Sequence, residues 1–174
     1  HEEQQPKSLD HLLAISYRSI GWGANLLLNV PPTTSGGLDP ADVARVTEWA
    51  DEWHRRLDAL TEAPMTPASS ETTGPRWVIQ LDGRPIDHLA IREDLTAGQQ
   101  IFSHRILTAD GQLVASGGTI GSLRIHAFPA IATHQLVIET DGGQLRSVRA
   151  GLTGIERRED LPVGFEAPTV APES

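Results

Sequence analysis

Residues 23–32 read GANLLLNVPP, and this stretch decides how the first third of the chain is interpreted. The apolar run over residues 25–30 lies between Gly23 and the paired prolines Pro31 and Pro32. A half-exposed strand alternates apolar and polar residues, whereas a strand covered on both faces reads as a continuous apolar run, as in a parallel sheet. The stretch therefore predicts a buried strand of the parallel type.

Helical patterns flank this strand on both sides. Apolar residues at helical spacing over 7–20 predict a helix that Ser8 caps and Gly21 ends. An Asp-Pro pair beginning at Asp39 is a typical helix start, and a long apolar face follows over residues 43–60. A single buried strand cannot pair its backbone groups without strands on either side. Its neighbours must therefore come from elsewhere.

From residue 76 onward the pattern changes to short Val/Ile/Leu-rich runs separated by turn signals. The runs lie at 77–81, 89–91, 100–107, 112–115, 119–126, 134–140 and 145–152. This spacing predicts an antiparallel β-sandwich over residues 76–154. Residues 61–75 have the Pro, Ser and Thr content of a linker, and residues 155–174 that of an extended tail.

Length, charge and cysteine content narrow the function classes. A chain of 174 residues is too short for a complete (β/α)8 barrel of about 250 residues. Its 14 basic and 23 acidic residues give a net charge of −9, which opposes binding to nucleic acid or anionic lipid. No apolar run approaches the roughly 20 residues of a membrane helix. Cysteine is absent, which removes disulfides and thiolate chemistry. The compartment stays open, with an extracellular or periplasmic one slightly favoured.

Motifs in both halves resemble one enzyme family. They are YRSIG at 17–21, GANLLLNVPP at 23–32 and DVAR at 42–45, then LAIREDL at 89–95 and GTIGSLRI at 118–125. Together they resemble the C-terminal part of the glycoside hydrolase family 29 α-L-fucosidases. The resemblance implies an α/β barrel remnant over residues 1–60, formed by the last helix–strand–helix of a (β/α)8 barrel. An antiparallel, jelly-roll-like β-sandwich follows, so the second half is mostly β.

The resemblance also implies a reaction. Family members are similar to retaining glycosidases, in which an Asp nucleophile and a Glu acid/base lie about 5–5.5 Å apart. The expected substrates are terminal α-L-fucosyl linkages of glycans, with α-1,3/1,4 linkages favoured. In the family both carboxylates lie on earlier barrel strands, so we expect them upstream of His1 and expect no catalytic residue in this chain. We then expect the chain alone to be inactive and to need the missing N-terminal barrel polypeptide as its partner. No cofactor or metal is expected.

Two residues are candidates for substrate binding through the resemblance. His1 is expected at the rim of the sugar site, and Asn29 at the carboxyl end of the last barrel strand, where a structural role remains the alternative. Glu2 and Glu3 are expected on an active-site loop. Because adjacent side chains point apart, a solvated acidic loop is the favoured interpretation for that pair.

Other polar and aromatic groups favour structural roles. Arg92, Glu93 and Asp94 are expected to form a solvated face at a strand end. Trp49 and Trp53 lie on the apolar face of the long helix and are expected to pack in the core. The seven histidines show no zinc-binding spacing.

A second function class stays open, namely a non-catalytic carbohydrate-binding β-sandwich module. Such modules stack sugars on exposed aromatic side chains. After Trp77 the sandwich half and tail contain only Phe102, Phe128 and Phe165 as aromatic residues. The sequence therefore favours the enzyme fragment over the binding module.

Overall fold

The computed structural model describes residues 6–68 and 74–154. Helix α1 spans Leu9–Arg18, a 3-10 turn η1 spans Ile20–Trp22, and helix α2 spans Pro40–Asp58. Neither α-helix is long and apolar enough to cross a membrane. The tail predicted over 155–174 lies outside the described residues.

Both predicted helix starts are confirmed at the level of single hydrogen bonds. The Ser8 hydroxyl accepts from the His11 N–H at 3.3 Å, and the Asp39 carboxylate accepts from the Ala41 N–H at 2.8 Å. These bonds satisfy N–H groups that the first helical turn leaves unpaired. The first α-helix ends before residue 20, because the chain tightens into η1. Gly23, with φ of 78°, then ends that turn in the left-handed region that glycine tolerates.

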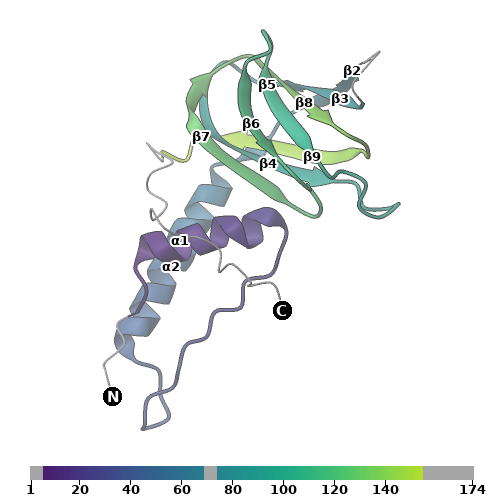
Figure 1. The fold of residues 1–174 in the computed structure, drawn as a ribbon. Coiled ribbons are helices and arrows are strands. Elements are labelled where there is room, and N and C mark those ends of the chain that lie inside the picture. Colours follow the sequence, from purple (N-terminus) through teal and green to yellow (C-terminus); the bar gives the residue numbers. More distant parts are fainter. Residues whose placement is uncertain (1–5, 69–73, 155–174) are drawn as a thin grey trace, which may run out of the picture.

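In the described residues, nine strands form two antiparallel sheets that face each other as a sandwich (Figure 1). The first sheet has the order β1 (Thr61–Glu62), β9 (Leu145–Gly151), β4 (Pro85–Glu93), β7 (Arg124–Ala132). The second has the order β2 (Met65–Ala68), β3 (Arg76–Gln80), β8 (Gln135–Thr140), β5 (His104–Thr108), β6 (Leu113–Gly117). The predicted β-sandwich is therefore confirmed, and each of its seven predicted runs contributes to a strand.

The core between the sheets is aliphatic. Its fully buried members include Ile79, Leu89, Ile91, Ile106, Leu136, Ile138 and Val148. Strand β4 is buried over residues 86–91 without alternation, because its inner face meets this core and its outer face meets the helices. The apolar run at 89–91 thus reflects a strand covered on both sides.

The linker predicted over residues 61–75 is wrong for its first eight residues. Thr61–Glu62 pairs with β9, and Met65–Ala68 pairs with β3. The proline content predicts a linker, but β2 lies at the edge of its sheet. Pro67 is tolerated there because the outer side of an edge strand pairs with no further strand and needs no backbone N–H donor. Residues 69–73 lie outside the described part of the chain.

The helix pair packs on the outer face of the first sheet (Figure 1). A second apolar cluster joins Leu13 and Tyr17 of α1, Trp53 of α2, and Ala90 and Ile125 of the sheet. Trp53 is only 5% exposed and meets the Tyr17 ring edge-on, with centroids 5.2 Å apart. Core packing of this tryptophan, predicted from its helical spacing, is confirmed.

The buried strand predicted over residues 25–30 does not form in this structure. Residues 24–31 belong to no helix or strand, and the Leu27 side chain is 94% exposed. The physical reason is the lack of neighbouring strands. A strand of this kind needs a paired strand on each side, and in residues 6–68 and 74–154 no strand lies beside it.

Candidate functional site

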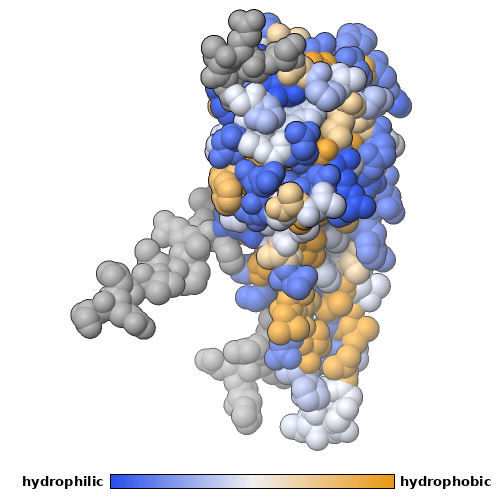
Figure 2. All heavy atoms as spheres, turned by 90° about the vertical axis from the view of Figure 1, so that its right-hand side faces the viewer, coloured by the Kyte–Doolittle hydropathy of each residue, from blue (hydrophilic) through white to orange (hydrophobic). Residues whose placement is uncertain are grey.

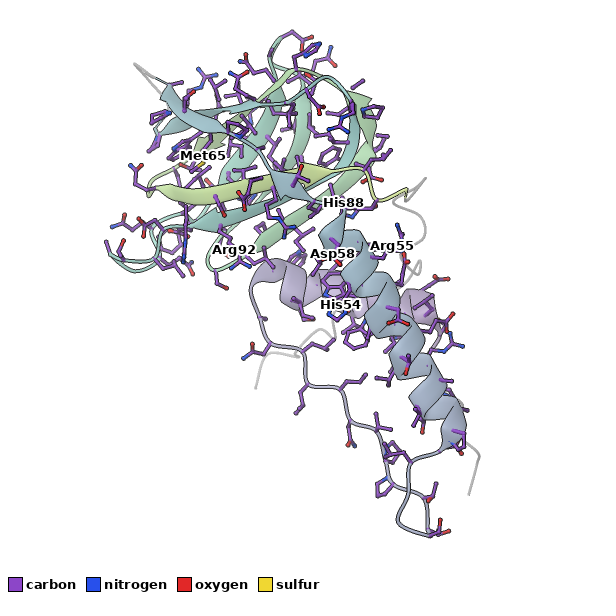
Figure 3. All side chains as sticks on the ribbon, turned by 180° about the vertical axis from the view of Figure 1, so that it is seen from behind. His54, Arg55, Asp58, Met65, His88 and Arg92 are labelled. Carbon is purple, nitrogen blue, oxygen red and sulfur yellow. The ribbon has the colours of Figure 1, made fainter. Side chains whose placement is uncertain are left out.

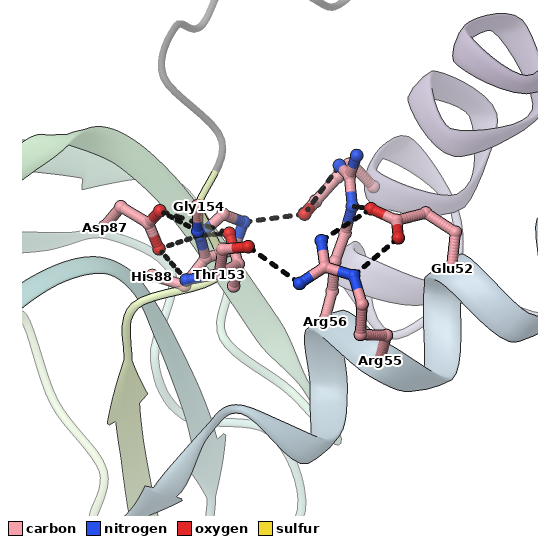
Figure 4. Close-up of polar contacts among 8 residues, drawn as sticks. Glu52, Arg55, Arg56, Asp87, His88, Thr153 and Gly154 are labelled. Atoms are coloured by element: carbon pink, nitrogen blue, oxygen red, sulfur yellow. Dashed lines mark hydrogen bonds and ion pairs between the residues drawn. The ribbon is translucent and has the colours of Figure 1, made fainter.

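A buried polar cluster joins the helix pair to the sandwich, and we call it the joint (Figure 4). It consists of Tyr17 of α1, Arg56 of α2, Asp87 and His88 of β4, and Thr153 just after β9. The Tyr17 hydroxyl lies 2.6 Å from His88 Nε2, and His88 Nδ1 lies 2.7 Å from Asp87 Oδ1. Asp87, His88 and Thr153 are each at most 3% exposed. One chain of hydrogen bonds therefore crosses from sheet to helix.

The charge states of the joint follow from burial and hydrogen bonding. Burial lowers the pKa of His88 below its ordinary value and raises the pKa of Tyr17. Burial alone would raise the pKa of Asp87, but hydrogen bonds from Thr153 and His88 outweigh it, and that pKa is lowered. At neutral pH the joint thus holds a carboxylate, a neutral imidazole and a protonated phenol.

These charge states assign the direction of each hydrogen bond. The Asp87 carboxylate can only accept, so His88 donates from Nδ1 and accepts from the Tyr17 hydroxyl at Nε2. The Tyr17 oxygen in turn lies 3.4 Å from Arg56 Nη1, which donates to it. Asp87 also accepts from the N–H groups of Thr153 and Gly154, at 2.8 and 3.0 Å. Every ring nitrogen and hydroxyl of the joint has a partner.

Two arginines of α2 extend the joint to the surface. Arg55 donates to the Thr153 carbonyl at 2.9 Å, and Glu52 accepts from both Arg55 and Arg56 at 2.6 Å (Figure 4). Hydrogen bonding by Arg55, ahead of that by Arg56, lowers the pKa of Glu52 to about 2. Glu52 therefore stays ionised and holds both guanidinium groups toward the sandwich.

A second buried carboxylate corrects a prediction. Glu93, expected on a solvated face, is only 2% exposed. Its Oε1 accepts from the N–H groups of Gln100 and Ile101 at 2.5 and 2.9 Å, and its Oε2 accepts from Gly121 N–H at 3.0 Å. The loops after β4 and before β7 fold over the strand end and use this carboxylate as their common acceptor. Asp94 beside it is exposed, as expected.

Histidines also meet within the sandwich. His104 Nε2 lies 2.7 Å from His126 Nε2, and His104 Nδ1 lies 2.7 Å from the Gly118 carbonyl. Within residues 6–68 and 74–154, no group of three or more His, Asp or Glu side chains is placed to hold a metal ion. The pair joins β5 of the second sheet to β7 of the first through two hydrogen-bonded, buried rings.

The chain between the two helices presents an apolar surface, and we call residues 24–39 the open segment. Leu27 is 94% and Leu38 53% exposed, and Trp22 and Val43 on either side are 53% and 45% exposed. Figure 2 shows hydrophobic residues gathered on the lower half of the molecule, below the sandwich. At its far end, Thr33 and Gly37 close a turn through backbone bonds. Contiguous apolar exposure of this kind is typical of an interaction surface.

Comparison with known proteins gives this geometry a context. A scan against protein-family models found no match. α-L-Fucosidase 1 of Arabidopsis thaliana is 26% identical in an alignment of 162 positions, gaps included, that covers 74% of this chain and 32% of that protein. A crystal structure from Bacteroides ovatus, assigned as an α-L-fucosidase, matches with a TM-score of 0.76 at 28% identity, covering 96% of this chain and 29% of its own. The chain resembles the C-terminal part of family 29 α-L-fucosidases.

A further fucosidase of this family has the same fold. The Ruminococcus gnavus family 29 fucosidase, solved in complex with fucose, matches with a TM-score of 0.67 at 22% identity, over 91% of this chain and 39% of its own. The resemblance and the fold class predicted from the motifs are thereby confirmed. The chain spans about a third of the length of the curated fucosidases it matches.

Of the two residues predicted to bind substrate, the structure describes only Asn29. Asn29 lies exposed on the open segment, where it lines a cavity of about 190 Å³ with Leu12 of α1 and Val46 of α2. His1, like Glu2 and Glu3, lies outside the described residues. Asn29 thus lies on the exposed face of the open segment, and its part in substrate binding stays a prediction.

A larger hollow, of about 620 Å³, lies where α2 ends beside the sandwich. Glu62, Asp82 and Arg84 stand at its lining among aliphatic side chains, and among the described residues that form it none is aromatic. A sugar-stacking platform is therefore absent from the described lining of this hollow.

The joint is the feature that sequence reasoning missed. The sequence pattern indicated no zinc-binding spacing for His88 and its fellow histidines, and it singled out no role for Asp87. An available signal was an Asp-His pair within an otherwise apolar strand, since buried charged groups need partners. Its partner Tyr17, however, is 71 residues away in sequence.

Proposed function

We propose that this chain is the C-terminal portion of a retaining α-L-fucosidase that hydrolyses terminal α-L-fucosyl linkages of glycans, with α-1,3/1,4 linkages favoured. Residues 1–60 supply the last helix–strand–helix of the catalytic barrel, and the sandwich packs beside it. The Asp nucleophile and the Glu acid/base belong to barrel strands upstream of His1. The chain then works only together with those strands.

The exposure of the open segment carries this proposal. Leu27 is 94% exposed inside an unbroken apolar run, although apolar residues of this size favour burial by about 1.5–3 kcal/mol each. Burial on both faces and pairing at both edges is what a barrel offers its strands. The similarity to fucosidases over most of this chain, but only about a third of theirs, supports the same partner.

The proposed chemistry assigns this chain a supporting part. The nucleophile attacks the anomeric carbon of fucose as the acid/base protonates the departing oxygen, and water then hydrolyses the glycosyl-enzyme ester. The open segment, once paired, carries Asn29 at the end of the last strand, where active sites of such barrels lie. Asn29 and His1 are our candidates for contacts to the sugar.

Complementation tests the proposal. We expect the purified chain alone not to hydrolyse an aryl α-L-fucoside, and turnover to appear when a polypeptide carrying the upstream barrel strands is added. Leu27→Asp should abolish this gain, because it introduces a charge between paired strands. Leu113→Asp, which changes a 56% exposed leucine on β6, is the matched control and should leave turnover intact.

Two results would contradict the proposal. Hydrolysis by the chain alone would mean that a catalytic pair lies within it. A monodisperse chain that binds fucosylated glycan, gains no activity from barrel strands and tolerates Leu27→Asp would support the carbohydrate-binding module instead.

A further inference from the structure

His88 occupies the contact between sandwich and helix pair (Figure 3). It lies on β4, is 2% exposed, and has both ring nitrogens engaged. Its Nδ1 bonds within the sandwich, to Asp87, whereas its Nε2 bonds to Tyr17 of α1. The imidazole is therefore a bridge between two parts of the fold that apolar packing alone would join without fixed orientation.

The bridge is complete only while the ring is neutral. The groups facing His88 are Tyr17 from α1, Arg56 from α2, Asp87 on its own strand and the Thr153 hydroxyl after β9. A proton on Nε2 would have to be donated to the Tyr17 oxygen, which already accepts from Arg56. The Tyr17 hydrogen would then have no acceptor among the described residues, which costs about 1–3 kcal/mol in a buried site.

Charge adds to this effect. Protonation of His88 would place a second positive charge near Arg56, and repulsion by Arg56 lowers the pKa of His88. Asp87 has the opposite effect, because its carboxylate favours the protonated ring. Burial is the largest cause and leaves the pKa of His88 below its ordinary value. As the pH falls below about 6.5, an unfolded or undocked chain takes up the proton first. Stability from the neutral bridge is thus complete above that pH and decreases on acidification.

We infer that His88 is a positioning residue: its neutral imidazole fixes the helix pair on the sandwich, and acid loosens this contact. The helix pair holds both ends of the open segment, so His88 also sets how that segment is presented to its partner. This last consequence rests on the proposed function, whereas the acid response does not.

Hydrogen exchange of the full chain tests the inference without any enzyme activity. After correction for the intrinsic exchange rate, we expect protection of the α1 amides to fall between pH 7 and pH 5, by at most about tenfold per pH unit, which is the limit for one coupled proton. In His88→Gln the fall should be absent, because no group then titrates at the joint in this range. The matched control is His54→Gln, an exposed histidine of α2, which should keep the wild-type response.

A measurement on the unaltered chain covers the case in which His88→Gln does not fold. In ¹⁵N spectra of the histidine rings, His88 should be the neutral Nδ1–H tautomer at pH 7 and should titrate below the ordinary histidine pKa of about 6.5. An equal fall of α1 protection in wild type and His88→Gln would overturn the inference. So would titration of His88 at or above a pH of about 6.5, the ordinary histidine value.

Discussion

Replacing Glu93 by alanine should destabilise the sandwich far more than its position at a strand end suggests. The carboxylate is 2% exposed and accepts three backbone N–H groups, from Gln100, Ile101 and Gly121. The Ile101 bond is fully buried, whereas the other two are partly buried and water can replace part of them. A buried donor left unpaired costs about 1–3 kcal/mol, so we expect a total loss of about 2–4 kcal/mol.

Urea unfolding followed by circular dichroism measures this loss, with Asp94→Ala as the matched control. Asp94 is exposed and, among the described residues, its carboxylate accepts from Thr96 within its own turn, so its replacement should cost less than about 1 kcal/mol. The stability loss for Glu93→Gln should lie between the losses for Glu93→Ala and Asp94→Ala. The amide oxygen of the new side chain can accept from two of the donors, while its NH₂ group faces the third. Equal midpoints for Glu93→Ala and Asp94→Ala would refute the assignment of Glu93 as a buried loop acceptor.

Three further variants test other parts of the fold by the same unfolding assay. Trp53→Ala, at a 5% exposed site, should cost about 3–5 kcal/mol, and a loss below 1 kcal/mol would contradict its core position. Gly143→Ala places a Cβ 2.6 Å from Ile101 Cγ1 at φ 69° and should cost more than Gly111→Ala, at φ 88° with open space around it. The pKa of Asp87 is lowered, so wild type should lose stability as the pH falls below about 4, and Asp87→Asn should lose less, because Glu52 still contributes to the acid loss; equal acid profiles would contradict the joint.

Features encoded by neighbouring residues were predictable from the sequence. Ser8 and Asp39 bond to N–H groups two or three residues away, so the helix starts follow from local chemistry. The sandwich strands follow from apolar runs between turns. The similarity to fucosidases was equally visible in the motif at residues 23–32.

Features that depend on distant partners were not predictable. The joint needs Tyr17 and His88 to meet across 71 residues, and the burial of Glu93 needs two loops to close over it. The proline-containing strand β2 has linker composition, and only its pairing with β3 makes it a strand. For residues 25–30 the prediction errs in the opposite direction: their pattern predicts a strand, but its pairing partners are absent from the described chain.

Hydrogen exchange at residues 26–30 tests most directly our proposal that residues 25–30 of the open segment form the last strand of a fucosidase barrel. Alone, these amides belong to no strand and should exchange within seconds. When the polypeptide carrying the upstream barrel strands is added, they should become protected together with the appearance of fucosidase turnover. Turnover gained while residues 26–30 still exchange freely, or no protection at any partner concentration, would contradict the claim.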